Sequence, residues 1–314
     1  MYLVTGGAGF IGSHIVKALN DRGITDIIVV DDLTQCSRFG NLADCRIADY
    51  LDRSELRKQL DAGTFAASVR AIFHQGACTD TMETDGRYMM DNNFAFSKAL
   101  LQFALTCRVP FVYASSAATY GASSETRIDP ANERPLNVYG YSKLVFDQHV
   151  RHLASKAGST VVGLRYFNVY GPNEAHKGRM ASMVYQLHRQ LSQTGKARLF
   201  EGTGGYGNGE QRRDFVFVGD VVNVNLFFAE APVRKAIVNV GTGQSRSFND
   251  IARTLISLRG GGDIEYIPFP QELEGKYQSF TEADLSDLRA AGYTAPFTSL
   301  EDGIAQCVGA WSAQ

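Results

Sequence analysis

The chain has 314 residues, of which 44% are hydrophobic, so it can build a substantial core in one large domain or two smaller ones. The formal net charge of -2 argues against a protein that coats DNA or an anionic membrane, and we expect no nucleic-acid or membrane partner. The five cysteines are scattered without a CxxC pair, which fits neither a zinc site nor a disulfide framework and suits a reducing cytoplasm: Cys36, Cys45, Cys78, Cys107 and Cys307.

The start of the chain and its apolar stretches bear on location. Strand-like sequence at Tyr2 runs straight into a glycine turn at Gly6, which leaves no room for a signal peptide. No apolar stretch approaches the roughly 20 residues needed to span a bilayer. We therefore expect a soluble, cytoplasmic protein, and the cysteine and histidine pattern predicts no metal site.

Short apolar runs alternate with helical patterns through the first half of the chain, as the βαβ units of a parallel sheet require. The run at 27–30 is continuously apolar and β-branched, which is typical of a strand covered on both faces. We predict strands at 2–5, 27–30, 71–74, 111–114 and 161–166, and helical segments at 11–21, 92–107 and 139–156.

The regular alternation of apolar and helical patterns ends after Gly171-Pro172. Residues 202–209 are rich in glycine and polar residues and predict a mobile loop. The runs at 215–218 and 237–240 predict strands that return to the sheet, and 300–311 predicts a final helix. We expect a dinucleotide-binding domain at 1–169 plus 213–240, and a smaller, interleaved α/β substrate domain formed mainly by 170–212 plus 241–314.

Three glycines follow the first predicted strand. Gly6, Gly9 and Gly12 have the spacing GxxGxxG and open the first helix. Glycine allows the tight turn, the approach of backbone N–H groups to a pyrophosphate and the close packing of helix on strand. The helix N-terminus adds donors and a dipole that favours phosphate. This context predicts a dinucleotide site in a Rossmann-type, doubly wound parallel sheet.

Acidic residues close the second predicted strand about 20 residues further on, where a carboxylate would bind the adenosine ribose. Asp31 and Asp32 occupy this place and favour NAD. Arg38 and Arg53 can reach the same corner, and arginine suits the 2′-phosphate of NADP. Both arginines could equally be solvated surface charges, so the residues leave NADP and NAD open.

A Ser–Tyr–Lys set provides the candidate chemistry. Ser116 lies at the end of a predicted strand, and the carboxyl ends of parallel strands face the ligand crevice. Tyr139 and Lys143 stand four positions apart and share one face of a helix. We expect the lysine ammonium to lower the pKa of Tyr139, so that the tyrosine can exchange protons near neutral pH. A YxxxK pattern alone is common by chance. The dinucleotide-binding glycine motif upstream and the serine-rich strand end favour a catalytic role for this one.

These motifs occur together with others along the whole chain, which resembles the extended short-chain dehydrogenase/reductase family. The stretches at 5–12, 114–121 and 136–143 are shared across that family, and RYFNVYGP at 165–172 and RDFVFVGD at 213–220 add to them. The narrower segments His176-Lys177-Gly178 and IEYIPFP at 264–270 resemble nucleotide-sugar epimerases that act on an ADP-linked heptose.

The resemblance implies that C6 of an ADP-linked heptose is inverted by transient oxidation and re-reduction, for the synthesis of a lipopolysaccharide core precursor. Tyr139 would remove the hydroxyl proton while a hydride passes to the nicotinamide, and the ketone would turn over and take the hydride back on its other face. The family's second acid/base corresponds to Lys177, since the two epimers present their hydroxyl groups differently. Without the resemblance, Lys177 would be read as an exposed loop lysine.

The resemblance also assigns binding residues. An arginine suits a diphosphate, so Arg213 has an independent rationale, although a salt bridge to Asp214 is an alternative. Besides the three glycines, the cofactor would be lined by Phe10, Ile11, Asp31, Asp32, Arg38, Arg53, Gln75, Gly76, Ala77, Cys78, Thr79, Asn92, Lys143, Val169 and Lys177. The substrate would meet Asn168, Arg179, Gln186, Phe200, Glu201, Gly202, Thr203, Arg213 and Tyr277.

Several positions depart from the family pattern. Asp32 replaces an expected asparagine, and Arg38 and Arg53 replace expected lysines, which weakens the implied preference for NADP over NAD. The loop at 204–211 is longer and richer in glycine than expected. Gln186 replaces an expected histidine, which leaves room for a different sugar.

Three other functions share these features. A nucleotide-sugar dehydratase would need an acid and a base after Ser116, where Ala117 and Ala118 stand. A non-catalytic NADP-binding regulator tends to lose the tyrosine or the lysine, and both are present. A UDP-hexose 4-epimerase, or another nucleotide-sugar epimerase, is the runner-up. The resemblance further implies a homo-oligomer, with a pentamer as the first form to test.

Overall fold

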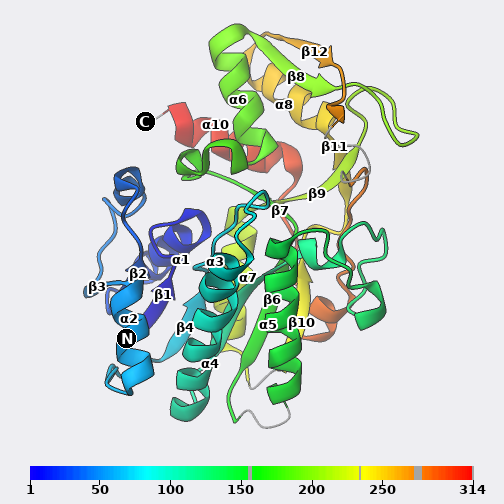
Figure 1. The fold of residues 1–314 in the computed structure, drawn as a ribbon. Coiled ribbons are helices and arrows are strands. Elements are labelled where there is room, and N and C mark those ends of the chain that lie inside the picture. The colour runs from blue at the N-terminus through cyan, green and yellow to red at the C-terminus, as the bar shows by residue number, and fades with distance from the viewer. Residues whose placement is uncertain (155–157, 233–234, 272–277, 313–314) are drawn as a thin grey trace.

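The computed structural model describes residues 1–154, 158–232, 235–271 and 278–312, and its larger part is a seven-stranded sheet (Figure 1). The order is β10-β6-β5-β4-β1-β2-β3, and each neighbouring pair is parallel. The strands are β1 (Tyr2–Thr5), β2 (Ile27–Asp31), β3 (Asp49–Asp52), β4 (Ala71–His74), β5 (Phe111–Ser116), β6 (Val161–Tyr166) and β10 (Lys235–Val240).

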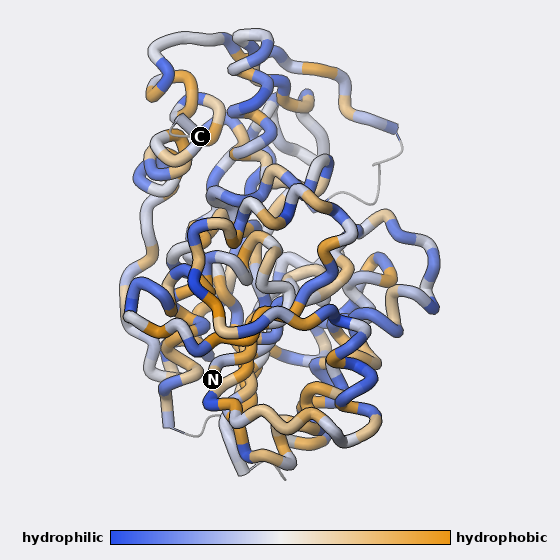
Figure 2. The backbone as a smooth tube through the Cα atoms, turned by 90° about the vertical axis from the view of Figure 1, so that its left-hand side faces the viewer, coloured by the Kyte–Doolittle hydropathy of each residue, from blue (hydrophilic) through white to orange (hydrophobic). Residues whose placement is uncertain are grey.

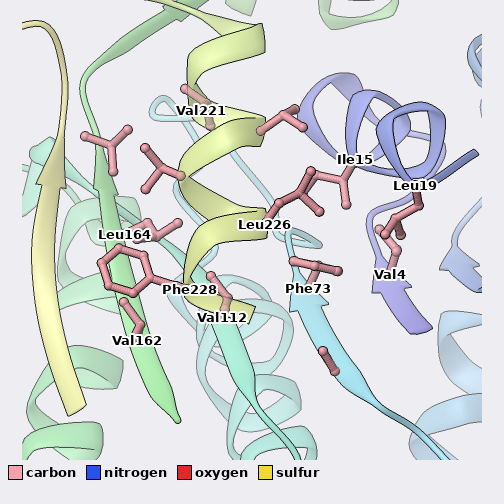
Figure 3. Close-up of a cluster of buried hydrophobic side chains, with 14 of the residues drawn as sticks. Val4, Ile15, Leu19, Phe73, Val112, Val162, Leu164, Val221, Leu226 and Phe228 are labelled. Carbon is pink, nitrogen blue, oxygen red and sulfur yellow. The ribbon is translucent and has the colours of Figure 1, made fainter. Parts of the chain in front are cut away.

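Helices cover both faces of this sheet, because successive side chains of each strand point to opposite faces. Val4 packs on one face with Ile15 and with Val221, from α1 (Phe10–Asp21) and α7 (Val218–Glu230), as Figure 3 shows. Leu3 packs on the other face, beneath α2 (Arg53–Ala62), α4 (Phe96–Cys107) and α5 (Val138–Ala154). The inner strands β1, β2 and β6 are buried along their whole length, which explains their largely apolar sequence.

A smaller part lies above the carboxyl ends of the large sheet in Figure 1. It contains the sheet β11-β9-β7 and the parallel pair β12-β8. Leu187, Leu255 and Ile304 share its core. Its strands are β7 (Asn168–Tyr170), β8 (Lys196–Phe200), β9 (Arg212–Phe217), β11 (Ser245–Ser247) and β12 (Asp263–Ile267), and its helices are α6 (Met183–Thr194), α8 (Phe248–Arg259) and α10 (Leu300–Ser312).

Short helical turns complete the chain. Three of them carry residues of the predicted sites: a 3-10 turn at Cys36–Asn41, a π turn at Asp91–Ala95 before α4 and a 3-10 segment at Ala175–Met180. The others are 3-10 turns at Ala117–Tyr120 and Pro130–Asn132, and the short helices α3 (Gly86–Met90) and α9 (Ser286–Ala290). In Figure 2 hydrophobic stretches run through the middle of the larger part, and hydrophilic ones dominate the outer loops. No helix in the described ranges combines the length and the apolar character that a bilayer crossing needs.

The predicted doubly wound sheet and most predicted elements are confirmed, but the placement of one strand is wrong. We expected 215–218 to return to the large sheet, whereas β9 pairs with β7 and β11. Phe215 packs in the upper core and Val216 in the lower one, so β9 is buried on both faces because it lies between two cores. The predicted helix at 139–156 ends in the structure at Ala154, and 155–157 lie outside the described residues. The division into two domains stays a prediction.

Candidate active site

The predicted site residues gather at the carboxyl ends of the parallel strands, as in other doubly wound sheets. The glycine turn follows β1, Asp31 ends β2, the loop at 75–79 follows β4 and Ser116 ends β5. The smaller part of the molecule stands over this edge (Figure 1). The topology therefore brings together segments that are far apart in the sequence.

The turn after β1 has room only for glycine. Gly6 has a φ of 65°, and a Cβ there would lie 2.7 Å from the Cα of Gly76. A Cβ on Gly12 would lie 2.0 Å from the carbonyl oxygen of Gly6. Asp31 holds the turn in place, since its Oδ2 accepts a hydrogen bond from the N–H of Ala8 at 2.8 Å. This turn fits the close approach of a pyrophosphate to the first turn of α1.

The corner predicted for the adenosine ribose is crowded with charge. Arg38 Nη1 lies 3.3 Å from Asp31 Oδ1, and Arg38 Nε is buried without a hydrogen-bond partner. Hydrogen bonds from Thr34 lower the pKa of Asp32, and the nearby guanidinium groups of Arg53 and Arg38 lower it further. The structure therefore brings the four predicted residues together and leaves one arginine donor available to a ligand.

Polar contacts fix the loop that follows β4. Gln75 Nε2 donates to Asn225 Oδ1 at 2.9 Å, and its Oε1 accepts from the hydroxyl of Tyr166 at 2.9 Å. The N–H of Cys78 donates to Asn93 Oδ1 at 2.8 Å, and Asn93 Nδ2 donates to the oxygen of Cys78 at 2.9 Å. The predicted loop residues Gly76 and Ala77 are therefore held between two anchored neighbours.

The π turn before α4 aims two asparagines at the site, and such turns are frequent at functional sites. Asn93 Nδ2 donates to Ser142 Oγ at 3.0 Å, and that hydroxyl donates to the backbone carbonyl oxygen of Tyr139 at 2.7 Å. Asn92 was predicted to line the cofactor, and its Oδ1 is buried without a partner. Orphaned polar atoms on Asn92 and Arg38 fit a bound dinucleotide, because buried polar groups are ordinarily hydrogen-bonded.

Ser116, Tyr139 and Lys143 meet between β5 and the first turns of α5. Tyr139 and Ser116 share a side-chain hydrogen bond. Lys143 Nζ donates to the oxygen of Ala114, the residue two before Ser116, at 2.8 Å. Burial lowers the pKa of Lys143 to about 8. Tyr139 therefore has Ser116 as the hydrogen-bond partner that a proton transfer at its hydroxyl can use, whereas Lys143 is hydrogen-bonded to β5.

The expected effect of Lys143 on Tyr139 is wrong in this structure. Burial raises the pKa of Tyr139, and the hydrogen bond with Ser116 opposes that rise. The Lys143 ammonium is directed at a carbonyl oxygen of β5, and burial lowers its own pKa. Spacing on the helix predicted that the two side chains share a face, but spacing carries no information about desolvation.

A buried ionic network lies beneath this set. Asp147, one further turn along α5, accepts from Arg165 Nε at 2.9 Å and from the hydroxyl of Ser115 at 2.9 Å. Arg165 also donates to Glu133 Oε1 at 2.6 Å, and its guanidinium lies 4.9 Å from the ring centre of Tyr120. Arg165 and Asp147 are both fully buried. The network ties α5 to the strands β5 and β6 directly behind the predicted catalytic residues.

Lys177 approaches the cofactor side from the 3-10 segment at Ala175–Met180. Its Nζ lies 5.0 Å from the ring centre of Phe10, which begins α1 directly after the glycine turn. The side chain is 23% exposed, so Lys177 is not the exposed loop lysine of the alternative interpretation. Burial lowers its pKa, and the carboxylate of Glu174 at 3.9 Å opposes that effect.

Two predicted substrate residues make contacts near Lys177. Arg179 Nη2 donates to Asp80 Oδ2 at 2.8 Å, next to the loop at 75–79. Gln186, on the first turns of α6, donates from Nε2 to the oxygen of Gly178 at 2.7 Å. Asn168 and Val169 lie on β7, where the chain passes from the large sheet to the smaller part.

The remaining predicted substrate residues belong to the smaller part. Arg213 is buried on β9 and lies over the ring of Phe248, with 5.8 Å to its centre. Asp214, the alternative partner of Arg213, accepts backbone hydrogen bonds from Thr242, Gly243 and Ala283. β8 ends at Phe200, and the loop after it contains Glu201, Gly202 and Thr203 and is closed by a 2.8 Å hydrogen bond from the N–H of Gly202 to Asn208 Oδ1. Tyr277 lies outside the described residues.

A surface cavity of about 280 Å³ is lined by residues of the turn at Cys36–Asn41, of the segment just before Lys177, of α6 and of α10. Asn41, Asn173, Tyr185 and Trp311 are among its lining residues, and none of the predicted catalytic residues is. The hydrogen bonds and the strand order therefore locate the candidate active site at the carboxyl ends of the strands, and not at this cavity.

Comparison with known proteins agrees with this geometry. The model of the NAD dependent epimerase/dehydratase family matches residues 2–241. The chain belongs to this family. It is 55% identical, over 304 residues, to a protein of Alkalilimnicola ehrlichii named ADP-L-glycero-D-manno-heptose-6-epimerase, and the match covers 97% of this chain and 95% of that protein.

Solved structures of the same kind resemble this epimerase-family chain. Helicobacter pylori ADP-L-glycero-D-manno-heptose-6-epimerase has a TM-score of 0.85 and 32% identity, with 100% of this chain and 96% of that chain covered. Thermus thermophilus UDP-glucose 4-epimerase, solved with NAD, has a TM-score of 0.81 and 26% identity, with 99% and 98% covered. The predicted resemblance to nucleotide-sugar epimerases is confirmed, and a nicotinamide cofactor is supported.

The sequence did not reveal the residues of this epimerase-family site that hold the predicted site residues in place. Asn93 and Glu174 carry no motif of their own, although Glu174 precedes Lys177 by one helical turn. Asp147 extends the spacing of Tyr139 and Lys143 by another four positions, which could have been read as one more residue on the same face.

Proposed function

We propose that this chain converts ADP-D-glycero-D-manno-heptose to ADP-L-glycero-D-manno-heptose by inverting C6 of the heptose. The observation that carries the substrate is the 55% identity, across 97% of the chain, to a protein named for that reaction. The geometry supports an epimerase with two acid/base groups, because a partly buried lysine, Lys177, approaches the first turn of α1 from a different segment than Tyr139 does.

Tyr139 acts on the substrate hydroxyl. Its phenolic oxygen, hydrogen-bonded with Ser116, removes the hydroxyl proton as the carbinol carbon is oxidised, and Ser116 can hold the same substrate oxygen. Lys143 donates to the carbonyl oxygen of Ala114 and would line the cofactor beside Tyr139. NADP, held by the glycine turn and by the corner that contains Arg38, would supply the acceptor and donor of the C6 hydride when bound.

Lys177 serves the other epimer. Inversion changes which side of C6 carries the hydroxyl group, so one fixed base need not reach both epimers. Lys177 lies on a separate loop, and burial lowers its pKa toward the range in which an amine exchanges protons readily. Lys177 therefore donates or accepts the proton for the epimer that Tyr139 does not serve.

NADP is our choice of cofactor, although NAD shares the same turn. Arg38 and Arg53 flank Asp32, and a buried nitrogen of Arg38 has no protein partner. A guanidinium suits the 2′-phosphate that distinguishes NADP from NAD. Asp31 is occupied by the N–H of Ala8 and by Arg38, which limits its use as a ribose acceptor.

The predicted substrate residues fit an ADP-linked sugar that reaches into the smaller part of the molecule. Arg213 suits the diphosphate, and Arg179 and Gln186 stand on the segments that flank Lys177. Asn168 and the loop Phe200–Thr203 would complete the contacts. We also propose a cytoplasmic homo-oligomer whose product supplies lipopolysaccharide core synthesis, and a pentamer is the state to test first by analytical ultracentrifugation.

The function is tested by NMR of ADP-D-glycero-D-manno-heptose incubated with purified, cofactor-loaded protein and no added reductant. We expect the L-glycero epimer to appear without net change in cofactor redox state. An unchanged spectrum from folded, loaded protein would contradict the proposal, and UDP-hexoses would then be tried as substrates of a 4-epimerase.

A further inference from the structure

Glu174 is a fully buried carboxylate that joins the two ends of one loop. Its Oε1 accepts from the N–H of Gly171 at 3.3 Å and from the hydroxyl of Ser182 at 2.6 Å. Its Oε2 accepts from the N–H of Ser182 at 2.6 Å. Gly171 follows β7, and Ser182 is the N-cap of α6, so one side chain closes the segment that carries Lys177.

The same carboxylate faces the amine that this segment presents. Lys177 Nζ lies 3.9 Å from Glu174 Oε2 on one side and 5.0 Å from the ring centre of Phe10 on the other. An ammonium is favoured both by a buried anion and by the face of an aromatic ring. The position and the charge of Lys177 therefore both depend on a residue that is shielded from solvent.

The titratable histidines and the cysteine around Glu174 and Lys177 are mainly neutral at neutral pH. His176 has its pKa lowered to about 4 by burial, and the nearby charges of Arg38 and Lys177 add to that effect. Burial also lowers the pKa of His14, whose ring lies 3.0 Å from the oxygen of Pro172. Burial raises the pKa of Cys307 on α10, and the charge of Glu174 raises it further, so that thiol stays neutral.

We propose that Glu174 is a positioning residue for the reaction: it closes the Gly171–Ser182 segment and holds Lys177 as an ammonium that faces Phe10. This inference rests on the proposed catalytic role of Lys177. Burial alone lowers the pKa of Lys177, and the carboxylate raises it again. The lysine can thereby carry a proton when one epimer binds and lose it when the other epimer reacts.

The direct test is the ¹⁵N NMR titration of lysine side chains in the cofactor-loaded protein, with Lys177→Met used to assign the Lys177 signal. Glu174→Gln keeps the shape of the side chain and removes its charge. We expect the titration midpoint of Lys177 to fall by about 1 pH unit or more, as loss of a close opposite charge predicts. The limb of the kcat/KM pH profile that Lys177 controls should move to lower pH by the same amount.

Glu265→Gln is a matched control. It removes a carboxylate that also lies 3.9 Å from a lysine, Lys196, but this pair is exposed to solvent. Exposed pairs interact weakly, so the control should leave both the Lys177 midpoint and the pH profile unchanged.

Glu174→Asp separates the effect of the negative charge from the effect of the length and shape of the side chain. The aspartate keeps the charge but holds it one methylene further from Lys177, so we expect a midpoint between those of the wild type and Glu174→Gln. A wild-type Lys177 midpoint in both variants, or in the aspartate variant alone if the glutamine variant does not fold, would overturn the inference. Failure of the wild type to epimerise the ADP-heptose would instead overturn the proposed function, and the lysine titration needs no substrate.

Discussion

Tyr139 stands at the first turn of α5, where a hydrogen bond with Ser116 fixes its hydroxyl. Replacement of Tyr139 by phenylalanine removes only that oxygen, and we expect kcat to fall by at least about 100-fold, the usual range for loss of a general acid/base. The midpoint of thermal unfolding and the affinity for NADP should stay near those of the wild type.

The matched control for this prediction is Tyr141→Phe. Tyr141 lies on the same helix, and its side chain is 51% exposed. Its variant should keep wild-type turnover, measured by the same NMR assay. Near-normal turnover in Tyr139→Phe would exclude the tyrosine from the proton transfer.

Arg38 is the second residue whose role can be measured alone. In Arg38→Ala we expect the Kd for NADP to rise by about tenfold or more, because a charge-assisted hydrogen bond is worth about 1.5–3 kcal/mol. The Kd for NAD, which lacks the 2′-phosphate, should change by less than about threefold. Calorimetric titration of the cofactor-free protein measures both, and Arg22→Ala, which removes an exposed guanidinium paired with Glu230, is the control. Equal losses for the two cofactors would contradict a role toward the 2′-phosphate.

The sequence points to candidate ligand-binding residues more readily than to the residues that support them. Gly6, Tyr139 and Lys143 belong to motifs whose spacing is set by backbone geometry, and the structure brings them to one edge of the sheet. Their electrostatics did not follow from spacing, as the raised pKa of Tyr139 shows, because desolvation depends on the whole fold. The support that Asn93 gives was not predicted either, since its partners come from loops distant in the sequence.

At the scale of elements, Arg165 joins α5, β5 and β6 through fully buried ionic contacts. Arg165→Met leaves the buried carboxylate of Asp147 without its ionic partner, whereas Glu133 keeps its pair with Arg151, and removal of one member of a buried pair costs about 3–5 kcal/mol. We therefore expect the unfolding free energy in urea to drop by that amount. Arg57→Met, which breaks the exposed pair with Asp61 on α2, should change it by at most about 0.5 kcal/mol. Equal effects in the two variants would show that the buried network contributes no special stability.

The elements also show where sequence patterns are ambiguous. The apolar run of β9 was read as a strand of the large sheet because both of its faces are apolar, and it is apolar because Phe215 and Val216 enter different cores. The helical period from 92 to 107 did not reveal the π turn at Asp91–Ala95, which inserts a wider turn without breaking the amphipathic pattern.

For the whole molecule, the stability of the fold should depend on the protonation of His74. This ring is buried between β4 and α4, with Ser97 Oγ and Thr5 Oγ1 at 2.7 and 2.6 Å. Burial lowers its pKa from 6.5 to about 3, and the charge of Lys143 contributes. Below pH 6.5 the unfolded chain binds a proton that the folded protein rejects, so the unfolding free energy falls as the pH falls toward 3, by up to about 1.4 kcal/mol per pH unit.

Urea unfolding between pH 7.5 and 4.5 measures this slope. His74→Gln should have a shallower slope than the wild type, whereas His152→Gln, which replaces an exposed histidine on α5, should have the wild-type slope. An identical slope in His74→Gln would mean that other groups govern the acid sensitivity of the fold.

The overall architecture was easier to predict than the details of the site. An alternating β and α pattern that begins with a glycine turn is compatible with only a few sheet topologies. The order β10-β6-β5-β4-β1-β2-β3 places the turn after β1 between the ends of β2 and β4, with β5 next to β4, and this arrangement assembles the site. The smaller part was less predictable, since its short strands β7, β8 and β11 derive their pairing from contacts between distant segments.

The central claim is that the same hydrogen leaves and returns to the inverted carbon within one site. ADP-D-glycero-D-manno-heptose deuterated at C6, incubated with the loaded protein in ordinary water, tests it most directly. The account predicts that the L-glycero product keeps its deuterium at C6, with no net change in cofactor redox state. Loss of the deuterium to solvent during inversion would contradict it, because the carbon would then exchange a proton and not a hydride.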